Sequence, residues 1–299
     1  ALLTSGLFTG RIPFVRGAGG GNGIVDVTPA PSNVVVVDPR SNVPGSIVYA
    51  KAGNIWLQTG SDARQLTDGG DDAMPTWSAD GTWVYYVETR TKRTLYPAFG
   101  VPVYYEATYP TIVRVHADGS GREEIATGLF TRSGTRYQWF YWLRQPVPTA
   151  DGRTLAVMSD GPDPLRNDVV LQFLDVASGK LRSAGLPENP PLGHQDPAWR
   201  PGTGSQPLLY VVNDRDGTRG IPAIWRYDPA TKKTKPFSQQ GYVGPAWSPD
   251  GSKIAYWDSR DGGWANWAVY TMNADGTGKT KITSIPDKHY WPQWSPDGS

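Results

Sequence analysis

The stretch PAWSPDGSKIAYWDS (residues 245–259) is partly restated as PQWSPDGS at residues 292–299. Earlier copies of its Pro-x-Trp core are PTWSADG at 75–81, PVPTADG at 146–152 and PAWRPG at 197–202. The later copies lie about 50 residues apart, and a fixed period of that length indicates a repeat fold. The copies also differ from one another, because Pro148 takes the place of the Trp in one of them.

Each motif copy except the last is followed by three further runs of strand-like sequence. After Pro245 these runs are KIAYWD (253–258), AVYTMN (268–273) and KTKITS (279–284). Alternating apolar residues separated by Asp-Gly or Ser-Gly pairs are typical of antiparallel hairpins. Each unit is therefore predicted to be a four-stranded sheet, whose strands we call A (the motif strand), B, C and D. Such a unit is typical of a β-propeller blade.

The motif Pro-x-Trp-Ser-Pro-Asp-Gly stands unaltered at Pro245 and Pro292. In this feature the repeats of residues 45–299 resemble the propeller repeats of the TolB type. The resemblance implies a β-propeller fold and a location outside the cytoplasm, in the periplasm, at the cell surface or secreted. It says little about activity, because one fold can host many functions.

The two ends of the repeat region complement each other. Residues 45–70 supply strand B (47–50), strand C (54–58) and strand D (63–67) without a strand A, whereas residues 292–299 supply a strand A alone. Pairing these two segments would close the ring and remove the open sheet edges. The sequence thus predicts an all-β propeller of five four-stranded antiparallel blades, closed by the C-terminal strand A joining the N-terminal blade. Six blades are the alternative, if the natural chain extends beyond Ser299.

The chain divides into an N-terminal arm or linker, residues 1–44, and the propeller domain, residues 45–299. The arm contains GAGGGNG (17–23) and TPAPS (28–32), which are typical of flexible and extended linkers. It also contains the strand-like NVVVVD (33–38), which is expected to form an edge strand on this propeller or, as the alternative, to pair with a neighbouring molecule. Self-association through this arm is therefore one expectation for the protein.

Composition excludes several classes of function. Charged residues make up 19% of the 299 residues and the formal net charge is +1, which argues against both nucleic acid and an anionic membrane as partners. No apolar run is long enough to span a membrane. The chain has no Cys, so a thiolate nucleophile, a disulfide and a Cys-type zinc site are all excluded.

The connections between strands B and C vary most in sequence, and variable loops on a rigid scaffold are where binding usually resides. The longest is predicted to be an inserted loop, residues 89–110, which mixes aromatic and basic side chains. Such a mixture is suited to contact with another protein or a glycan. The alternative is a lid that merely packs on the propeller. The candidate binding residues of this loop are Arg93, Tyr96, Phe99, Tyr104 and Tyr105.

The connections between strands D and A are predicted to end at the mouth of a central channel. Residues just before each motif Pro should then form a ring, and they give these candidate binding residues: Asp72, Arg144, His194, Tyr242, His289 and Tyr290. Imidazole and carboxylate groups are ordinary metal ligands, so a divalent metal at His194 and His289 is an alternative to hydrogen-bonding histidines. The resemblance extends to a propeller lyase acting on oligogalacturonate that uses a metal at its channel mouth, although two His do not match that site.

These observations favour a non-enzymatic protein-binding or assembly module that uses the loop-rich face of a TolB-like propeller. No catalytic residue and no cofactor is assigned, because none of the common catalytic or nucleotide-binding motifs is present. One alternative is a metal-dependent carbohydrate-active enzyme, a lyase or hydrolase, with its site at the channel mouth. Another is a structural subunit of a surface polymer, assembled through residues 1–44.

Overall fold

A computed structural model describes residues 43–164, 168–186, 192–213, 221–260, 267–284, 288–295 and 298. Nearly all of the predicted arm, residues 1–44, lies outside these ranges. The described residues form strands and turns, and none of them forms a helix with the length and hydrophobicity needed to cross a membrane.

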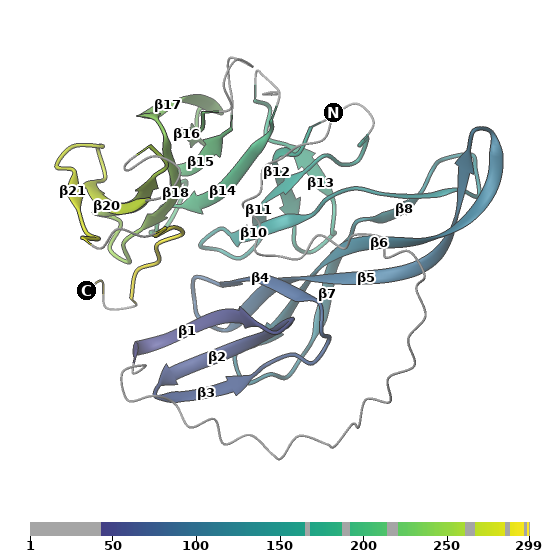
Figure 1. Ribbon diagram of the computed structural model, residues 1–299, viewed down its shortest axis with the longest axis horizontal. Coiled ribbons are helices and arrows are strands. Elements are labelled where there is room, and N and C mark those ends of the chain that lie inside the picture. The colour runs from purple at the N-terminus through teal and green to yellow at the C-terminus, as the bar shows by residue number, and fades with distance from the viewer. Residues whose placement is uncertain are drawn as a thin grey trace. The chain divides into compact units, whose positions relative to one another are not determined.

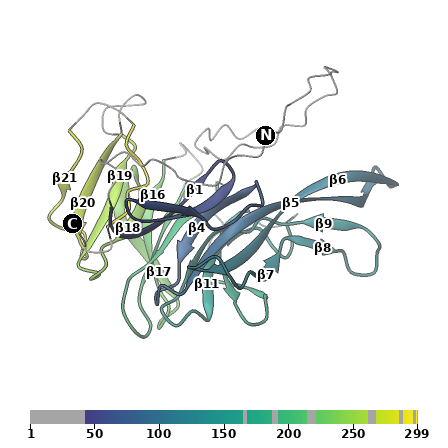
Figure 2. The same cartoon turned by 90° about the horizontal axis from the view of Figure 1, so that it is seen from below.

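The strands form five consecutive antiparallel sheets, which are the blades of a propeller (Figures 1 and 2). Blade 1 contains β1 (Val43–Lys51), β2 (Asn54–Gly60) and β3 (Asp62–Gln65). Blade 2 contains β4 (Asp72–Trp77), β5 (Trp83–Ala98), β6 (Val101–His116) and β7 (Glu123–Thr127). Blade 3 contains β10 (Arg144–Pro148), β11 (Thr154–Ser159), β12 (Val170–Asp175) and β13 (Leu181–Ser183).

The last two blades repeat the same order. Blade 4 contains β14 (His194–Trp199), β15 (Leu208–Val212), β16 (Ala223–Asp228) and β17 (Lys233–Gln240). Blade 5 contains β18 (Tyr242–Trp247), β19 (Lys253–Asp258), β20 (Ala268–Asn273) and β21 (Thr280–Lys281). The predicted all-β propeller of five blades is thus confirmed.

The Asp of the motif fixes the turn between strands A and B. In blade 5 the Asp250 carboxylate accepts hydrogen bonds from the Ser248 hydroxyl at 2.6 Å and from the Ser252 N–H at 2.9 Å. These bonds stabilise the charged form, so the pKa of Asp250 falls to about 2. Asp80 and Asp151 accept equivalent bonds in blades 2 and 3. The repeated Asp-Gly pairs therefore act as turn formers.

The hydrophobic core lies between neighbouring blades. Strand B of blade 4 packs on both faces, because every residue of β15 is buried. Leu208 of this strand belongs to a cluster shared with blade 3, whereas Leu209 belongs to one shared with blade 5. Strand β15 is consequently apolar along its whole length, unlike a strand with one solvated face.

The motif Trp of the last three copies is hydrogen-bonded to strand A of the preceding blade. The indole Nε1 of Trp199 donates to Val147 O at 3.2 Å, and that of Trp247 donates to Ala198 O at 3.1 Å. Trp294 makes the equivalent bond to Ala246 O at 3.0 Å. The C-terminal motif copy therefore stands where the strand A that follows blade 5 belongs.

In Figure 1 the last described segment runs between blade 5 and β1. Strands β4, β10, β14 and β18, which are the strands A of blades 2 to 5, surround a common centre in Figure 1, as the innermost strands of a propeller do. Within the described residues β1 is hydrogen-bonded only to β2. The ladder between β1 and residues 292–295 thus stays a prediction.

The predicted loop of residues 89–110 is a regular β-hairpin, so that expectation of its conformation was wrong. Strands β5 and β6 stay in register from the pair Trp83 and His116 to the pair Ala98 and Val101. Phe99 and Gly100 close it with positive φ angles of 49° and 82°, which a two-residue hairpin turn requires. The hairpin extends well beyond the rest of its blade (Figures 1 and 2).

A second, shorter hairpin supports the long one. It consists of β8 (Leu129–Thr131) and β9 (Gln138–Phe140), and it belongs to the connection between blades 2 and 3. Strand β9 lies against both β5 and β6. The two hairpins therefore leave the propeller from the same face.

Candidate functional site

The residue immediately before each motif Pro has a left-handed backbone conformation. The five residues are Met74 (φ 56°), Gln145 (φ 49°), Asp196 (φ 53°), Gly244 (φ 61°) and Trp291 (φ 49°). The ladder between strands A and B shifts register at the first four of these positions. A β-bulge of this kind redirects side chains, and it recurs in these four motif copies.

The bulge residues of successive copies touch one another, and we call the five together the axial cluster. The Gln145 N–H points to the Met74 sulfur at 3.4 Å, and the Gln145 side chain is hydrogen-bonded to Asp196. A Cβ added to Gly244 would lie 3.3 Å from Cδ1 of Trp291. The cluster therefore lines the centre of the propeller, around which the innermost strands are arranged (Figure 1).

Asp196 is the charged member of the axial cluster. The Gln145 carboxamide donates to its Oδ1 at 2.7 Å, and Gln145 Oε1 accepts from the Asp196 N–H at 3.0 Å. Burial raises the pKa of Asp196 to about 6, although the Gln145 hydrogen bond and the nearby Arg144 charge oppose this. Its Oδ2 is buried and has no hydrogen-bond partner of good geometry among the described residues. The Gly244 N–H and the Trp291 indole nevertheless lie close enough to this carboxyl group to lower its pKa.

Arg144 complements Asp196 at the same place. Burial lowers the pKa of the Arg144 guanidinium, and the charge of Asp196 raises it. The guanidinium carbon lies 5.9 Å from the ring centre of Trp142, within the range of a cation–π contact. The centre of the propeller thus presents a carboxyl group and a guanidinium group close together.

Exposed aromatic and aliphatic side chains lie on the residues that lead into strand A. They are Trp142 (44% exposed), Leu192 (37%), Tyr290 (37%) and Trp291 (37%). The rings of Tyr290 and Trp291 meet edge to face, with their centres 5.1 Å apart. Large apolar side chains that stay exposed around polar groups are typical of a binding surface. We call these four residues the channel rim.

The predicted ring of residues three positions before each motif Pro exists in the backbone. The N–H groups of Asp72, His194 and His289 donate to the carbonyl groups of Gly53, Val169 and Trp267 in the preceding blade, at 2.8, 2.9 and 3.0 Å respectively. The side chains of Asp72, His194 and Tyr242 are buried. These three residues therefore hold equivalent backbone positions, but the residues that meet at the centre of the propeller are the ones directly before the prolines. A binding role of the ring residues stays a prediction.

His194 is held in the interior of the propeller. Its Nδ1 accepts a hydrogen bond from the Leu171 N–H at 3.1 Å, and its ring meets Tyr210 edge to face at 4.9 Å. Burial lowers the pKa of His194 to about 3. In the part of the chain that the structure describes, no three His, Asp or Glu side chains are grouped so that they could hold a metal ion.

The candidate residues of the inserted segment divide into two sets. Tyr96 and Tyr105 pack together at 5.5 Å between ring centres, and Tyr96 also packs on Trp139 of β9 at 4.8 Å. Phe99 is fully exposed and Tyr104 is 63% exposed. The guanidinium of Arg93 lies over the Tyr104 ring, 5.0 Å from its centre. The first set braces the hairpin, and the second is available for contact.

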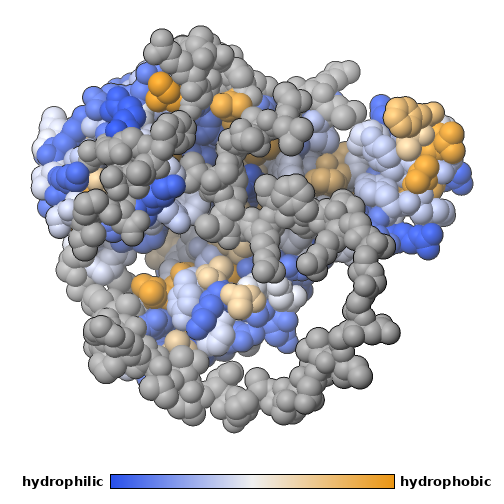
Figure 3. Space-filling view, viewed as in Figure 1, coloured by the Kyte–Doolittle hydropathy of each residue, from blue (hydrophilic) through white to orange (hydrophobic). Residues whose placement is uncertain are grey.

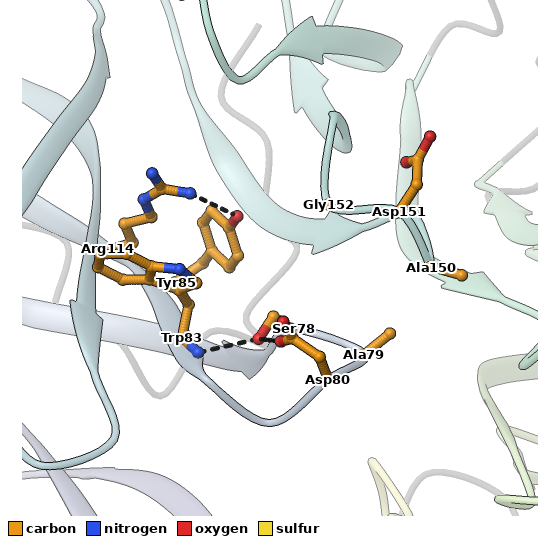
Figure 4. A pocket seen from close by; sticks show the side chains of 9 residues that line it. All are labelled: Ser78, Ala79, Asp80, Trp83, Tyr85, Arg114, Ala150, Asp151 and Gly152. Carbon is orange, nitrogen blue, oxygen red and sulfur yellow. Dashed lines mark hydrogen bonds between the residues drawn. The ribbon is translucent and has the colours of Figure 1, made fainter.

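A hollow of about 170 Å³ lies on the face opposite the channel rim, between the turns that join strands A and B in blades 2 and 3 (Figure 4). Its polar groups are already occupied. Arg114 donates to Glu123 at 2.6 Å and to the Tyr85 hydroxyl at 3.4 Å. Asp80 and Asp151 each accept a hydrogen bond from a hydroxyl group within their own turn. This hollow is therefore a weaker candidate than the channel rim.

Comparison with models of known protein families gives no match. The chain is 36% identical over 106 residues to an uncharacterized peptidase, YuxL, of Bacillus subtilis, which covers 34% of this chain and 16% of the peptidase. It is 35% identical over 99 residues to the Tol-Pal system protein TolB of Alcanivorax borkumensis and 39% identical over 99 residues to that of Anaeromyxobacter dehalogenans. These matches cover 33% of this chain and 22% and 21% of the two TolB proteins.

Solved structures give the same fold at lower identity. TolB from Acinetobacter baumannii matches with a TM-score of 0.57 and 18% identity, over 86% of this chain and 58% of that one. The tricorn protease matches with a TM-score of 0.56 and 13% identity, over 84% of this chain and 23% of the protease. The chain thus corresponds to only part of each relative.

Proposed function

This chain is a TolB-like β-propeller, and from that premise we propose that it is a non-enzymatic module that binds an extended segment of a partner protein at the channel rim, outside the cytoplasm. One observation carries the proposal. The exposed side chains of Trp142, Tyr290 and Trp291 lie around the centre of the propeller, where Oδ2 of Asp196 has no hydrogen-bond partner of good geometry among the described residues. The relatives named as Tol-Pal system proteins support a role in an assembly of proteins.

The chemistry of the rim suits a peptide chain. Aromatic side chains supply large contact areas at a small cost in conformational entropy, which is why Trp and Tyr are frequent in binding hot spots. Asp196 and Arg144 add one acceptor and one donor beneath them, where a polar side chain or backbone group of the partner can form hydrogen bonds. A partner segment would therefore be held by apolar contacts at the rim and oriented by polar contacts in the channel.

The proposal is tested by selection from a phage-displayed library of random peptides on the immobilised chain. Selected peptides are then titrated against Trp291→Ala and Arg144→Gln at the rim. Lys233→Ala serves as the matched control, because Lys233 is exposed at the opposite face. We expect each rim variant to weaken binding about tenfold or more, as hot-spot substitutions do, and the control to bind like the native chain.

Two outcomes overturn the proposal. Peptides that bind all four proteins equally would place the binding surface away from the rim. If no peptide is selected but oligosaccharides of a glycan array bind in a manner sensitive to Trp291, the rim is a carbohydrate site instead.

A further inference from the structure

The end of the long hairpin carries no charge. Residues 95–105 read LYPAFGVPVYY, and they contain only apolar, aromatic, Gly and Pro residues. They pair with one another from Leu95 and Tyr104 to Ala98 and Val101, so the whole segment belongs to the hairpin tip. The proposed function does not use this segment.

Apolar side chains of the tip are exposed to solvent. The large exposed ones are Phe99, Val101, Val103 and Tyr104. Figure 3 shows hydrophobic residues gathered at the end of the hairpin. Exposed apolar groups that adjoin one another on a soluble domain indicate an interaction surface.

The edges of the tip are unsuited to strand addition. Pro97 and Pro102 stand opposite each other in the ladder. Proline has no N–H group, so both outer edges of the hairpin lack a donor at this level, and edge prolines hinder pairing with another strand. The tip is therefore suited to contacts through side chains.

A cationic band follows the apolar tip. Lys92 and Arg93 are exposed, and neither takes part in an ion pair within the described residues. Glu106 stands opposite Arg93 in the ladder, yet the Arg93 guanidinium lies over Tyr104, which is nearer the tip. Six residues separate Arg93 from Phe99, so the band lies about 20 Å from the end of the hairpin.

Contacts with neighbouring elements brace the hairpin along its length. Tyr96 packs on Trp139 of the short hairpin, and the Tyr105 hydroxyl donates to Gln138 O at 3.3 Å. At the base of the hairpin, Arg90 is paired with Glu88 at 2.6 Å and with Glu124 at 2.7 Å. These contacts order the hairpin before any partner arrives, which lowers the entropic cost of binding.

We propose that this tip inserts into the surface of a lipid bilayer that contains anionic lipids. Phe99, Val101 and Val103 enter the boundary between headgroups and acyl chains, Tyr104 lies at the headgroup level, and Lys92 and Arg93 reach toward the lipid phosphates. Interfacial segments bury their apolar face by about 5–10 Å and place aromatic and basic residues above it. The net charge of +1 gives the chain no general attraction to such a surface, so the attraction is local.

Co-sedimentation with vesicles tests the proposal. The full chain is mixed with vesicles of phosphatidylcholine alone or of phosphatidylcholine with phosphatidylglycerol, and the bound fraction is measured at low and at physiological salt. We expect binding to the anionic vesicles. Phe99→Asp with Val101→Asp should abolish it, and Lys92→Gln with Arg93→Gln should weaken it about tenfold or more and reduce its salt dependence.

Control variants separate this inference from the proposed function and from misfolding. Ile282→Asp changes a large apolar residue that is exposed elsewhere, 56% by area, and Trp291→Ala changes the channel rim. Both should bind vesicles like the native chain, and all variants should keep the native circular dichroism spectrum. The proposal fails if the native chain binds no vesicle, or if the Phe99 variant changes only self-association, which would assign the tip to a second copy.

Discussion

Gln145 and Asp196 bind each other from neighbouring blades through two hydrogen bonds. The Gln145 carboxamide donates to Asp196 Oδ1 at 2.7 Å and accepts from the Asp196 N–H at 3.0 Å. Both residues have the left-handed conformation of the axial cluster, with φ angles of 49° and 53°. This pair joins strand A of blade 3 to strand A of blade 4 at the centre of the molecule. The protonation of Asp196 is therefore coupled to the stability of the propeller.

The first prediction concerns the pH dependence of Asp196. Its pKa is raised from 3.8 to about 6, so the folded chain keeps this proton over a range in which the unfolded chain releases it. Asp196 therefore lowers the free energy of unfolding progressively as the pH rises from about 4 to about 6, by about 3 kcal/mol at most. Asp196→Asn should be more stable than the native chain above pH 6, and the difference should vanish near pH 4, as measured by urea unfolding.

Gln145→Ala is the control for that measurement. It removes both hydrogen bonds and should lower the free energy of unfolding by about 1–3 kcal/mol, with the larger loss above pH 6, because the Gln145 carboxamide stabilises the charged form of Asp196. If the free energies of unfolding of the native chain and of Asp196→Asn differ by the same amount at every pH from 4 to 6, the prediction is contradicted.

The second prediction concerns His194 and has the opposite sign. Burial lowers its pKa from 6.5 to about 3, so below pH 6.5 the unfolded chain binds a proton that the folded chain excludes. Stability from this group is complete above pH 6.5 and is lost as the pH falls toward about 3. His194→Gln keeps an acceptor for the Leu171 N–H but cannot titrate there, so it should show a smaller loss of stability between pH 6.5 and pH 4.

His289→Gln is the matched control, because His289 holds the equivalent backbone position with a less buried side chain. Its unfolding curves should keep the acid sensitivity of the native chain. An unchanged acid sensitivity in His194→Gln would instead assign the effect to other groups.

The third prediction concerns the unpaired edge of blade 1. In blades 4 and 5 the motif residues Trp199 and Trp247 pair with Leu208 and Ile254. Leu208 and Ile254 each stand three positions before the residue that lies opposite Ile224 or Val269 in the next ladder. The N–H groups of Ile224 and Val269 donate to a Ser or Thr hydroxyl.

Ile55 donates in the same way to Thr67 and stands opposite Ala50. The equivalent register therefore pairs Trp294 with Ile47 and Gln293 with Val48. Because the chain has no Cys, Val48→Cys with Gln293→Cys should give a single disulfide under oxidation. The bond should be visible by non-reducing electrophoresis and should raise the free energy of unfolding by about 2–4 kcal/mol.

Tyr49→Cys with Gln293→Cys is the control, because the side chain at position 49 points to the other face of the strand. It should form no disulfide. Equal crosslinking of both pairs, or of neither, would mean that residues 292–295 do not complete blade 1 in this register.

The repeat made most of the fold predictable. Motif spacing gave the blade order, and the Asp-Gly pairs gave the hairpins because Asp carboxylates such as that of Asp250 satisfy the turn locally. Both signals depend on residues close together in the chain. They can therefore be recognised in the sequence without any knowledge of tertiary contacts.

The long hairpin could not be predicted in the same way. Pro97 and Pro102 interrupt the strand pattern of residues 89–110 and argue for a loop when each is considered alone. They are accommodated because they stand opposite each other in the ladder, where their missing N–H groups face outward. Only the pairing of the two strands reveals this.

The candidate site was predicted in part. Positions before each motif Pro were correctly recognised as equivalent, but the β-bulge decides which of them reaches the centre. In a regular strand, side chains alternate between the two faces, so the residues three positions and one position before the Pro should lie on the same face. The left-handed backbone at Asp196 instead turns the Asp196 side chain toward Gln145, whereas the His194 side chain stays in the core. The exposed rim residue Trp142 had no sequence signal of its own.

The axial cluster separates what the repeat preserves from what it lets vary. Its five positions share one backbone conformation but carry a thioether, a carboxamide, a carboxylate, a bare Gly and an indole. Met74 also packs against the core between blades 2 and 3, and Gln145 and Asp196 join two blades, so these three positions contribute to stability as well. The exposed Trp291 is then the position where a changed side chain would alter the surface at the centre of the propeller with the smallest effect on the contacts between blades.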